Sequence, residues 1–233
     1  MEGGVRVQRA SGDVRAPAGG GPLLPVSGIL LSGGHSRRMG RDKASLTWRG
    51  RPFAHWVLDA LGTVSDDVLA VRRPGQTAIA GAARTIFDRH RDAGPLAGLE
   101  AGLLAMHWEW AIVCPVDAPL VRPDLLRLLA RLMERRRKVT QAVVPVQDGR
   151  PQPLTACYHR SAAAVLGSAI AADRLRVLSA LDQLRILYVP EEVWRAVDPD
   201  GRSFAVINTP EEYARWCAVG TDSGPSGAPP SVV

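Results

Sequence analysis

The feature that most constrains the fold of this chain is a regular alternation between strand-like and helix-like hydrophobic patterns. Short apolar runs such as "SGILL" and "EWAIVCPVD" alternate with amphipathic segments such as "RPFAHWVLDAL" and "RPDLLRLLARLMERRRK". This alternation is typical of βα units, which build a mostly parallel sheet with helices on both faces. The sequence therefore predicts a single α/β domain with three layers in the order α/β/α.

The same patterns predict the individual elements. The last expected helix has a clear start signal, because Thr209 is a good N-cap, Pro210 suits the first helical position and Glu212 completes a capping box. The basic run at 134–138 fits a helix C-terminus, where cations complement the helix dipole. We expect strands at 27–31, 66–72, 83–88, 109–117, 140–147, 153–160, 184–190 and 203–208, and helices at 51–61, 94–107, 122–138, 161–172, 176–184 and 209–218.

The two ends of the chain lack these patterns. Residues 1–25 and 219–233 are rich in small residues and proline and have no hydrophobic period, so we expect disordered tails on either side of a domain at 26–218. With 46% apolar residues, the 233-residue chain can form a full core. No apolar run approaches the roughly 18 residues of a membrane span, and no signal-peptide core is present. A cytoplasmic protein with no membrane partner is expected.

Charge and cysteine content argue against two further classes of protein. The net charge of +6 could suggest a nucleic-acid partner, but no aromatic-interleaved RNA-binding signature or zinc-finger spacing accompanies the basic residues. We therefore expect no nucleic-acid partner. Cys114, Cys157 and Cys217 are far apart, odd in number and without CxxC pairing, which disfavours a zinc site or a disulfide framework. They are expected to be small core residues.

The segment after the first strand, "SGGHSRRMGRDK", is predicted to hold an anion. Gly33 and Gly34 let the backbone approach a ligand, and successive N–H groups can form an anion nest. Arg37, Arg38 and Lys43 add positive charge. The spacing matches neither the Walker pattern nor GxGxxG, so this would be a third way to bind phosphate. The alternative is an ordinary βα connection with solvated arginines.

A single carboxylate, Asp117, follows the strand expected at 109–117 and lies between Pro115 and Pro119. In a parallel sheet it lies at the same edge as the glycine-rich segment, where ligands of such sheets bind. Magnesium is commonly held by one or two carboxylates together with substrate phosphates. Asp117 is therefore a candidate Mg²⁺ ligand. The alternative is that its side chain only caps the helix that follows Pro119.

Four motifs together resemble a known family. In order and spacing, "LSGGHSRRMGRDK", "GPLAG", "CPVDAP" and "VINTPEEY" resemble the motifs of the molybdenum cofactor guanylyltransferases, within the wider nucleotidyltransferase family. The resemblance covers about residues 27–217 and implies a Rossmann-like nucleotidyltransferase fold. It also implies transfer of GMP from GTP to molybdopterin that carries molybdenum, with release of pyrophosphate and a requirement for Mg²⁺. Molybdoenzymes or other cofactor-biosynthesis proteins are then candidate partners.

The resemblance also implies roles for individual residues. Lys43, Asp117 and Arg38 would be catalytic, with Asp117 as the metal ligand. Arg176 and Asn208 would bind the pterin end of the acceptor. The residues implied to bind the nucleotide are Leu31, Ser32, Gly33, Gly34, Lys43, Asp88, Gly94, Gly98 and Asp117. The chain departs from the family at three positions: Val71 and Val206 stand where some members have Asn, and Ser32 stands where Ala is usual.

Two other functions remain open from the sequence. A related nucleotidyltransferase could use CTP on molybdopterin or on another phosphorylated small molecule, and it would keep Lys43 and Asp117 while changing only the base pocket. A non-catalytic nucleotide-binding module could use the same fold as a scaffold. The presence of both Lys43 and Asp117 argues against such a module.

Overall fold

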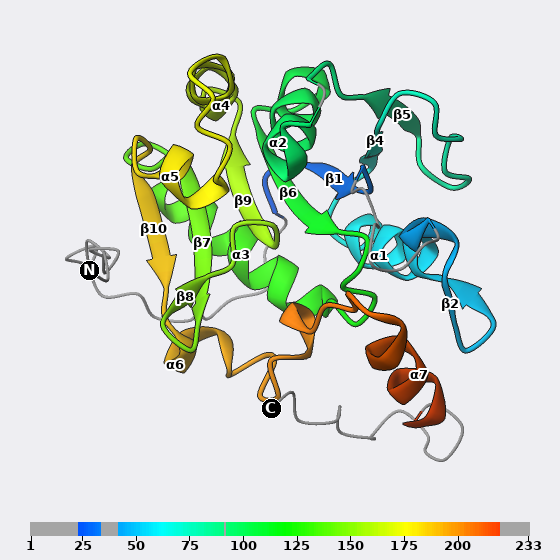
Figure 1. The fold of residues 1–233 in the computed structure, drawn as a ribbon. Helices are drawn as coiled ribbons and strands as arrows, with labels where there is room; N and C mark the ends of the chain where they lie inside the picture. The colour runs from blue at the N-terminus through cyan, green and yellow to red at the C-terminus, as the bar shows by residue number, and fades with distance from the viewer. Residues whose placement is uncertain (1–22, 34–41, 91, 220–233) are drawn as a thin grey trace, which may run out of the picture.

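A central eight-stranded sheet organises the residues that the structure describes, which are 23–33, 42–90 and 92–219 (Figure 1). The structure is a computed structural model, and most of the two predicted tails lies outside the described residues. The strand order is β10-β7-β9-β6-β1-β4-β5, with β8 paired to β7. The strands are β1 (Ser27–Leu31), β4 (Asp67–Arg72), β5 (Arg84–Phe87), β6 (Trp110–Pro115), β7 (Ala142–Gln147), β8 (Arg150–Pro151), β9 (Ala156–His159) and β10 (Ile186–Val189).

Most strand pairs are parallel, as the sequence predicts. Strand β9 runs antiparallel to β6 and β7, and β8 runs antiparallel to β7. The remaining pairs of this sheet, from β10–β7 to β1–β6, β1–β4 and β4–β5, are parallel. Strands β1, β4, β5 and β6 therefore all present their carboxyl ends at one edge of the sheet, where we expect a ligand.

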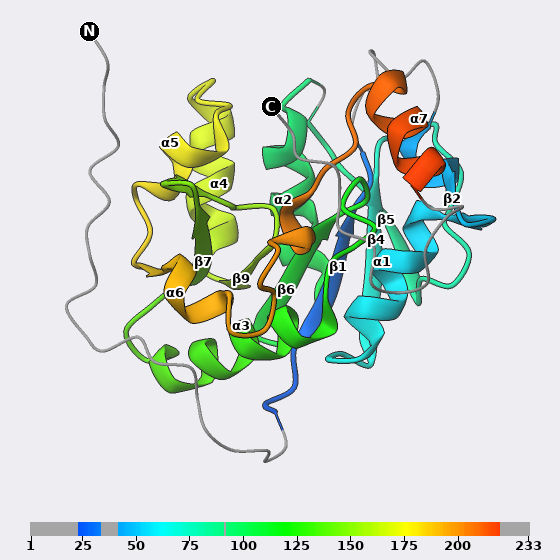
Figure 2. The same cartoon turned by 90° about the horizontal axis from the view of Figure 1, so that it is seen from below.

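Helices cover both faces of the sheet, which confirms the three-layer prediction (Figures 1 and 2). Side chains of α1 (Phe53–Gly62), α3 (Pro123–Arg136) and α6 (Glu191–Trp194) belong to the core cluster on one face. Side chains of α2 (Gly94–Ala105), α4 (Ala162–Ala171) and α5 (Val177–Leu181) belong to the cluster on the other face. The last helix, α7 (Pro210–Val219), packs at the edge of the first cluster through Tyr213.

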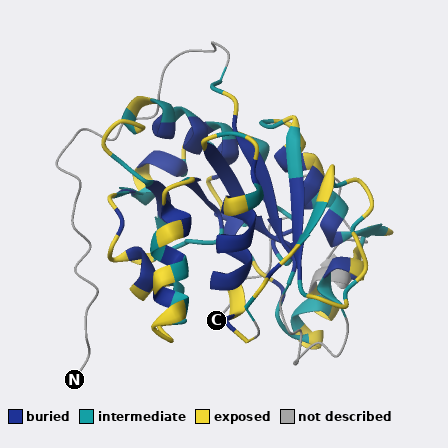
Figure 3. Cartoon of the chain, turned by 90° about the horizontal axis from the view of Figure 1, so that it is seen from above, coloured by how far each residue is buried: buried dark blue, intermediate teal, exposed yellow. Residues whose placement is uncertain are grey.

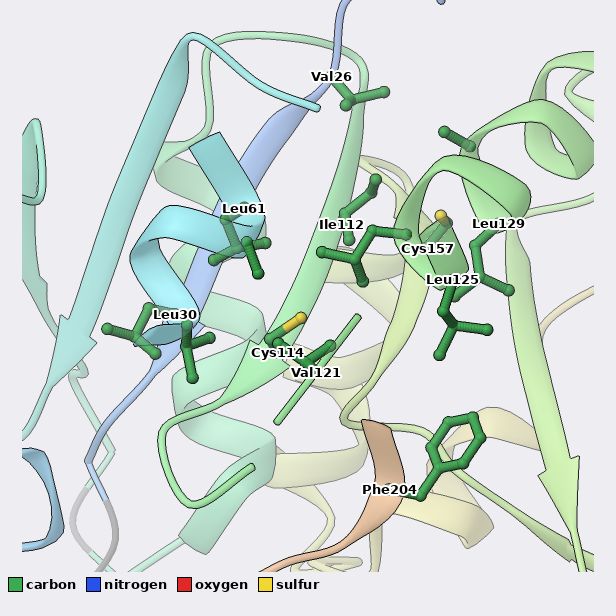
Figure 4. Packing of buried hydrophobic residues seen from close by; sticks show 14 of the residues in the cluster. Val26, Leu30, Leu61, Ile112, Cys114, Val121, Leu125, Leu129, Cys157 and Phe204 are labelled. Carbon is green, nitrogen blue, oxygen red and sulfur yellow. The ribbon is translucent and has the colours of Figure 1, made fainter. Parts of the chain in front are cut away.

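The central strands are apolar on both faces because both faces are covered. In β1, Ile29 and Leu31 join the cluster under α2, whereas Leu30 points into the cluster under α1 and α3. Figure 4 shows Leu30 near Leu61 of α1 in the cluster under α1 and α3. Coloured by burial, the central strands form the buried centre of the molecule, and the exposed positions lie on the outer helices, the loops and outer strands such as β5 (Figure 3).

The expected helices and all but one of the expected strands are present, with ends that shift by a few residues. The predicted capping box of α7 is confirmed: the Oγ1 of Thr209 accepts from the backbone N–H of Glu212 at 3.2 Å, and the Glu212 carboxylate accepts from the N–H of Thr209 at 3.1 Å. Cys114 and Cys157 are buried core residues, as expected. The side chain of Cys217 lies outside the described part of the chain.

The strand predicted at 203–208 is wrong. Arg202–Phe204 forms a 3-10 helix, η2, because the buried carboxylate of Asp198 accepts hydrogen bonds from the backbone N–H groups of Arg202 and Ser203. The N–H of Ile207 then donates to the carbonyl of Asp117 at 3.0 Å and not to a strand of the sheet. The sequence analysis also missed α6, β8, the hairpin of β2 (Thr47–Trp48) and β3 (Arg51–Pro52), and the 3-10 helix η1 (Lys43–Ser45).

Close packing of α2 on the sheet requires a glycine. A Cβ atom on Gly102 would lie 2.8 Å from Cγ2 of Ile29 and 3.2 Å from Cγ2 of Val71. We expect Gly102→Val to lower the free energy of unfolding by about 1–3 kcal/mol, because overpacking forces neighbouring side chains and backbone to move. The measurement is chemical denaturation of both variants. The control is the matched variant Gly62→Val, whose Cβ would meet nothing within 4 Å. Equal unfolding free energies for the two variants would contradict the prediction.

Candidate functional site

A pocket of about 920 Å³ opens at the carboxyl ends of β1, β4, β5 and β6. Each of these strands leads directly into lining residues, so the sheet itself determines where the pocket lies. Helix α2 forms a further wall of the pocket. Asn208, in the segment just before α7, also lines it. The lining residues are Leu31, Ser32, Gly33, Lys43, Arg73, Asp88, His90, Asp92, Gly94, Pro95, Gly98, Pro115, Val116, Asp117, Leu154 and Asn208.

The pocket brings together most of the residues singled out from the sequence. Leu31, Ser32, Gly33, Lys43, Asp88, Gly94, Gly98, Asp117 and Asn208 all line it. Gly34 and Arg38 lie outside the described residues. Arg176 is the exposed N-cap residue of α5 and is not among the lining residues, so its assignment to the pterin stays a prediction.

Three side chains from distant parts of the sequence meet inside the pocket. The Nζ of Lys43 donates to Oδ2 of Asp117 at 2.6 Å and to Oδ1 of Asn208 at 2.8 Å. The side chains of Lys43 and Asp117 are only 15% and 19% exposed, which strengthens their attraction relative to a surface pair. The alternative that Asp117 caps the following helix is wrong, because α3 begins later, at Pro123, with Arg122 at its N-cap.

These contacts show where a cation can be held. Asp117 Oδ2 and Asn208 Oδ1 converge on one point, which the Lys43 ammonium group occupies. A carboxylate and an amide oxygen are also suitable ligands for a hard divalent cation, and Mg²⁺ commonly takes its other ligands from water and substrate phosphates. The described residues contain no cluster of three or more His, Cys, Asp or Glu side chains that could hold a metal by themselves. A metal in this pocket would therefore be held jointly with a ligand.

Asn208 is positioned by the start of α7. Its backbone N–H donates to the Glu212 carboxylate at 2.6 Å, so the capping box also fixes the residue that reaches Lys43. The N–H of Ile207 donates to the carbonyl of Asp117, which ties this segment to the end of β6. The hydroxyl of Tyr213 donates to the carbonyl of Thr47 at 2.6 Å and anchors α7 next to the hairpin. This segment therefore completes the site.

The glycines of the pocket keep side chains out of its walls. A Cβ on Gly98 would lie 3.4 Å from Cδ2 of Leu31, and a Cβ on Gly33 would lie 3.4 Å from Oδ2 of Asp88. Gly94 has φ +61°, a conformation that favours glycine. Ala93 at the N-cap of α2 has no side-chain acceptor for the first N–H groups of the helix. The start of α2 lines the pocket, and the positive end of a helix dipole favours anionic groups.

The two valines that depart from the family pattern differ in their surroundings. Val71 is fully buried in the core cluster under α2, so its side chain does not line the pocket. Val206 is 42% exposed and lies two residues before Asn208. Cys114 and Cys157 do not line the pocket, and burial raises the pKa of both thiols above the usual range.

Sequence reasoning missed seven residues that line the pocket, which are Arg73, His90, Asp92, Pro95, Pro115, Val116 and Leu154. All but Leu154 lie at or shortly after the ends of β4, β5 and β6 or at the start of α2, so their place near the ends of predicted strands is a signal in the sequence. Leu154 gave no such signal, because it comes from the turn before the antiparallel strand β9.

None of the helices in the described part of the chain is long and apolar enough to cross a membrane.

Comparisons with known proteins agree with this geometry. The model of the MobA-like NTP transferase domain matches residues 28–186. A probable molybdenum cofactor guanylyltransferase from Bacillus licheniformis is 37% identical over 185 residues, which cover 77% of this chain and 90% of that protein. The crystal structure of molybdopterin-guanine dinucleotide biosynthesis protein A from Archaeoglobus fulgidus superposes with a TM-score of 0.72 and 29% identity, covering 85% of this chain and 100% of the other.

A more distant likeness concerns the fold alone. The 2-C-methyl-D-erythritol 4-phosphate cytidylyltransferase from Thermus thermophilus has a TM-score of 0.60 at 19% identity and covers 85% of this chain. The fold is thus shared between proteins named for different nucleotides. The family model matches well over half of the chain, and the relative from Bacillus licheniformis is similar over most of its length. The chain therefore belongs to the family of MobA-like NTP transferases.

Proposed function

We propose that this protein transfers GMP from GTP to molybdopterin that carries molybdenum and releases pyrophosphate. The observation that carries the proposal is the convergence of Lys43, Asp117 and Asn208 in one pocket at the carboxyl ends of the parallel strands. The names of the relatives from Bacillus licheniformis and Archaeoglobus fulgidus support the same substrates. Candidate protein partners are the molybdoenzymes that receive the product.

The reaction needs positioned charge more than covalent help from the protein. A terminal phosphate oxygen of molybdopterin attacks the α-phosphorus of GTP, the bond to the bridging oxygen of the β-phosphate breaks, and pyrophosphate leaves with the electron pair. The attacking phosphate is already ionised, so no general base is required. Lys43 stabilises the charge that develops on the leaving pyrophosphate, and we assign Gly34 and Arg38 to the same phosphates from the family resemblance.

The residues present fit a magnesium ion. Asp117 would supply a carboxylate oxygen and Asn208 an amide oxygen, beside the Lys43 ammonium group that both side chains contact. When bound, Mg²⁺ neutralises charge on the triphosphate and orients it. Asn208 also remains our candidate for binding the pterin end of the acceptor, on the basis of the family resemblance. Arg176 remains our candidate for the pterin ring system on the basis of the family resemblance.

Base recognition is assigned to backbone groups. The wall formed by Leu31 and the start of α2 includes Gly94 and Gly98, which add no side chain between their own backbone groups and the pocket, and Asp88 lines the same pocket as a contact to base or ribose. Guanine combines the N1–H and 2-amino donors with the O6 acceptor. A base that leaves such buried polar groups unpaired binds less tightly, by on the order of 1–3 kcal/mol for each group.

We expect at least a roughly tenfold preference for GTP over CTP in transfer to molybdopterin at equal Mg²⁺. Val71 does not line the pocket, so Val71→Ala should retain this preference and serves as a matched control. The measurement is kcat/KM for GTP, CTP, ATP and UTP with the purified protein. Equal or better use of CTP would contradict guanylyl transfer and favour the cytidylyl alternative. Nucleotide binding without any transfer would favour a non-catalytic module.

A further inference from the structure

A buried arginine next to the pocket takes no part in the proposed reaction. Arg72 is the last residue of β4, and its side chain is 2% exposed. It does not line the pocket, so its guanidinium group cannot be explained as a direct contact to the nucleotide. Buried arginines are rare unless their charge is paired, and the partners of Arg72 therefore indicate its role.

The guanidinium group of Arg72 connects two points of the chain that flank the glycine-rich segment. Its Nη1 donates to Oγ of Ser32 at 2.9 Å, and its Nη2 forms a salt bridge with Oδ2 of Asp42. Ser32 directly follows β1, and Asp42 directly precedes η1. One side chain thus holds both ends of this segment.

Asp42 in turn fixes the backbone at Lys43. Its Oδ1 accepts from the N–H of Ala44 at 3.0 Å, so Asp42 caps the 3-10 helix in which Lys43 is the first residue. The position of the Lys43 backbone therefore depends on where Arg72 holds Asp42. From this backbone position the ammonium group reaches Asp117 and Asn208.

The contribution of this ion pair to stability does not explain its presence. Burying an arginine charge costs free energy, and replacing a buried pair with apolar residues is often neutral or stabilising. The Nε–H of Arg72 has no acceptor among the described residues, which adds to the cost. The side chain of Asp42 is 35% exposed, so water can solvate it when the arginine is removed. We therefore expect a variant without this guanidinium group to fold.

We infer that Arg72 is a positioning residue that places the Lys43 ammonium group at the reacting phosphates by holding Ser32 and Asp42 together. This inference rests on the proposed nucleotidyl transfer. Arg72→Met removes the guanidinium group with little change in side-chain volume. Arg72→Lys keeps a positive charge but lacks the planar pair of donors that contacts both Ser32 and Asp42. Because small displacements of a catalytic group cost large factors in rate, Arg72→Met should lower kcat by roughly tenfold or more with a smaller change in KM for GTP. Arg72→Lys should be intermediate.

A double-mutant cycle with Lys43→Ala tests whether Arg72 acts through Lys43. We expect kcat of the double variant Lys43→Ala/Arg72→Met to equal that of Lys43→Ala within about twofold, because the residue being positioned is already absent. A merely structural arginine would lower activity by the same factor in both backgrounds. Arg127→Met breaks an exposed ion pair with Asp124 on α3 and is the control for loss of an arginine.

Each outcome separates the inference from the proposed function. Thermal unfolding of every variant verifies the fold, and Arg72→Lys replaces Arg72→Met in the cycle if the methionine variant unfolds. Additive effects, or an Arg72→Met variant as active as Arg127→Met, would overturn the role of Arg72 while leaving nucleotidyl transfer intact. Absence of transfer by the unaltered protein would instead contradict the proposed function.

Discussion

Lys43→Ala is expected to lower the turnover of GMP transfer by about 10²-fold or more, because preorganised positive charge at a developing pyrophosphate contributes roughly 3 kcal/mol to the transition state. The structure adds a reason why this charge is preorganised. Its Nζ donates to Asp117 at 2.6 Å and to Asn208 at 2.8 Å, so these two side chains hold the ammonium group in the pocket. The measurement is steady-state pyrophosphate release with GTP, Mg²⁺ and molybdopterin.

The control for this prediction must separate lost charge from lost packing. Lys43→Met keeps most of the aliphatic stem of the side chain, which is only 15% exposed, and removes the ammonium group. We expect Lys43→Met to be as slow as Lys43→Ala, with thermal unfolding close to that of the unaltered protein. Turnover near that of the unaltered protein in either variant would contradict the proposed role of Lys43 in stabilising the leaving pyrophosphate.

Asp117→Asn is expected to abolish transfer at low Mg²⁺ or to raise the Mg²⁺ concentration required by a large factor. A neutral amide is a poorer magnesium ligand than a carboxylate, and the metal contributes several kcal/mol of charge stabilisation in reactions of this kind. The fold should be retained, because the amide oxygen can still accept the hydrogen bond from Lys43. A titration of transfer rate against Mg²⁺ measures the effect.

A matched change at the surface controls for the loss of one negative charge. Asp124 on α3 is 59% exposed and forms a salt bridge with Arg127 three residues later, so Asp124→Asn should leave the Mg²⁺ dependence unchanged. If Asp117→Asn also retained full activity at limiting Mg²⁺, the metal would have to be held elsewhere in the pocket. Lys43 and the base preference for GTP would then keep their proposed roles.

The sequence predicts the parts of the site that depend on local pattern. Apolar strands followed by glycines or by a lone aspartate place Leu31, Gly33 and Asp117 at one edge of a parallel sheet, because such strands end at the same side. The capping box at Thr209 is likewise predicted from a local signal, and the structure confirms it. These residues needed no knowledge of which distant segments are neighbours.

Other parts depend on contacts that have no local signal. The segment at 203–208 has the composition of a strand, but buried Asp198 and the end of β6 bind its backbone more favourably than a sheet edge. In the sequence, Arg72 is simply a basic residue at the end of a predicted strand. Only the fold shows that it contacts both Ser32 and Asp42. The contact between Asn208 and Lys43 also joins residues far apart in the sequence.

The late position of Asn208 has a consequence for the newly made protein. Ribosomes synthesise a chain from its N-terminus, and domains fold as units during or after synthesis. Strands β1 to β6, Lys43 and Asp117 are made first, whereas the segment that binds Asp117 through Ile207 and Lys43 through Asn208 is made after them. A ribosome-bound nascent chain that has not yet received this segment therefore cannot assemble the complete pocket. We expect the capacity to consume GTP to arise only once this segment has been synthesised.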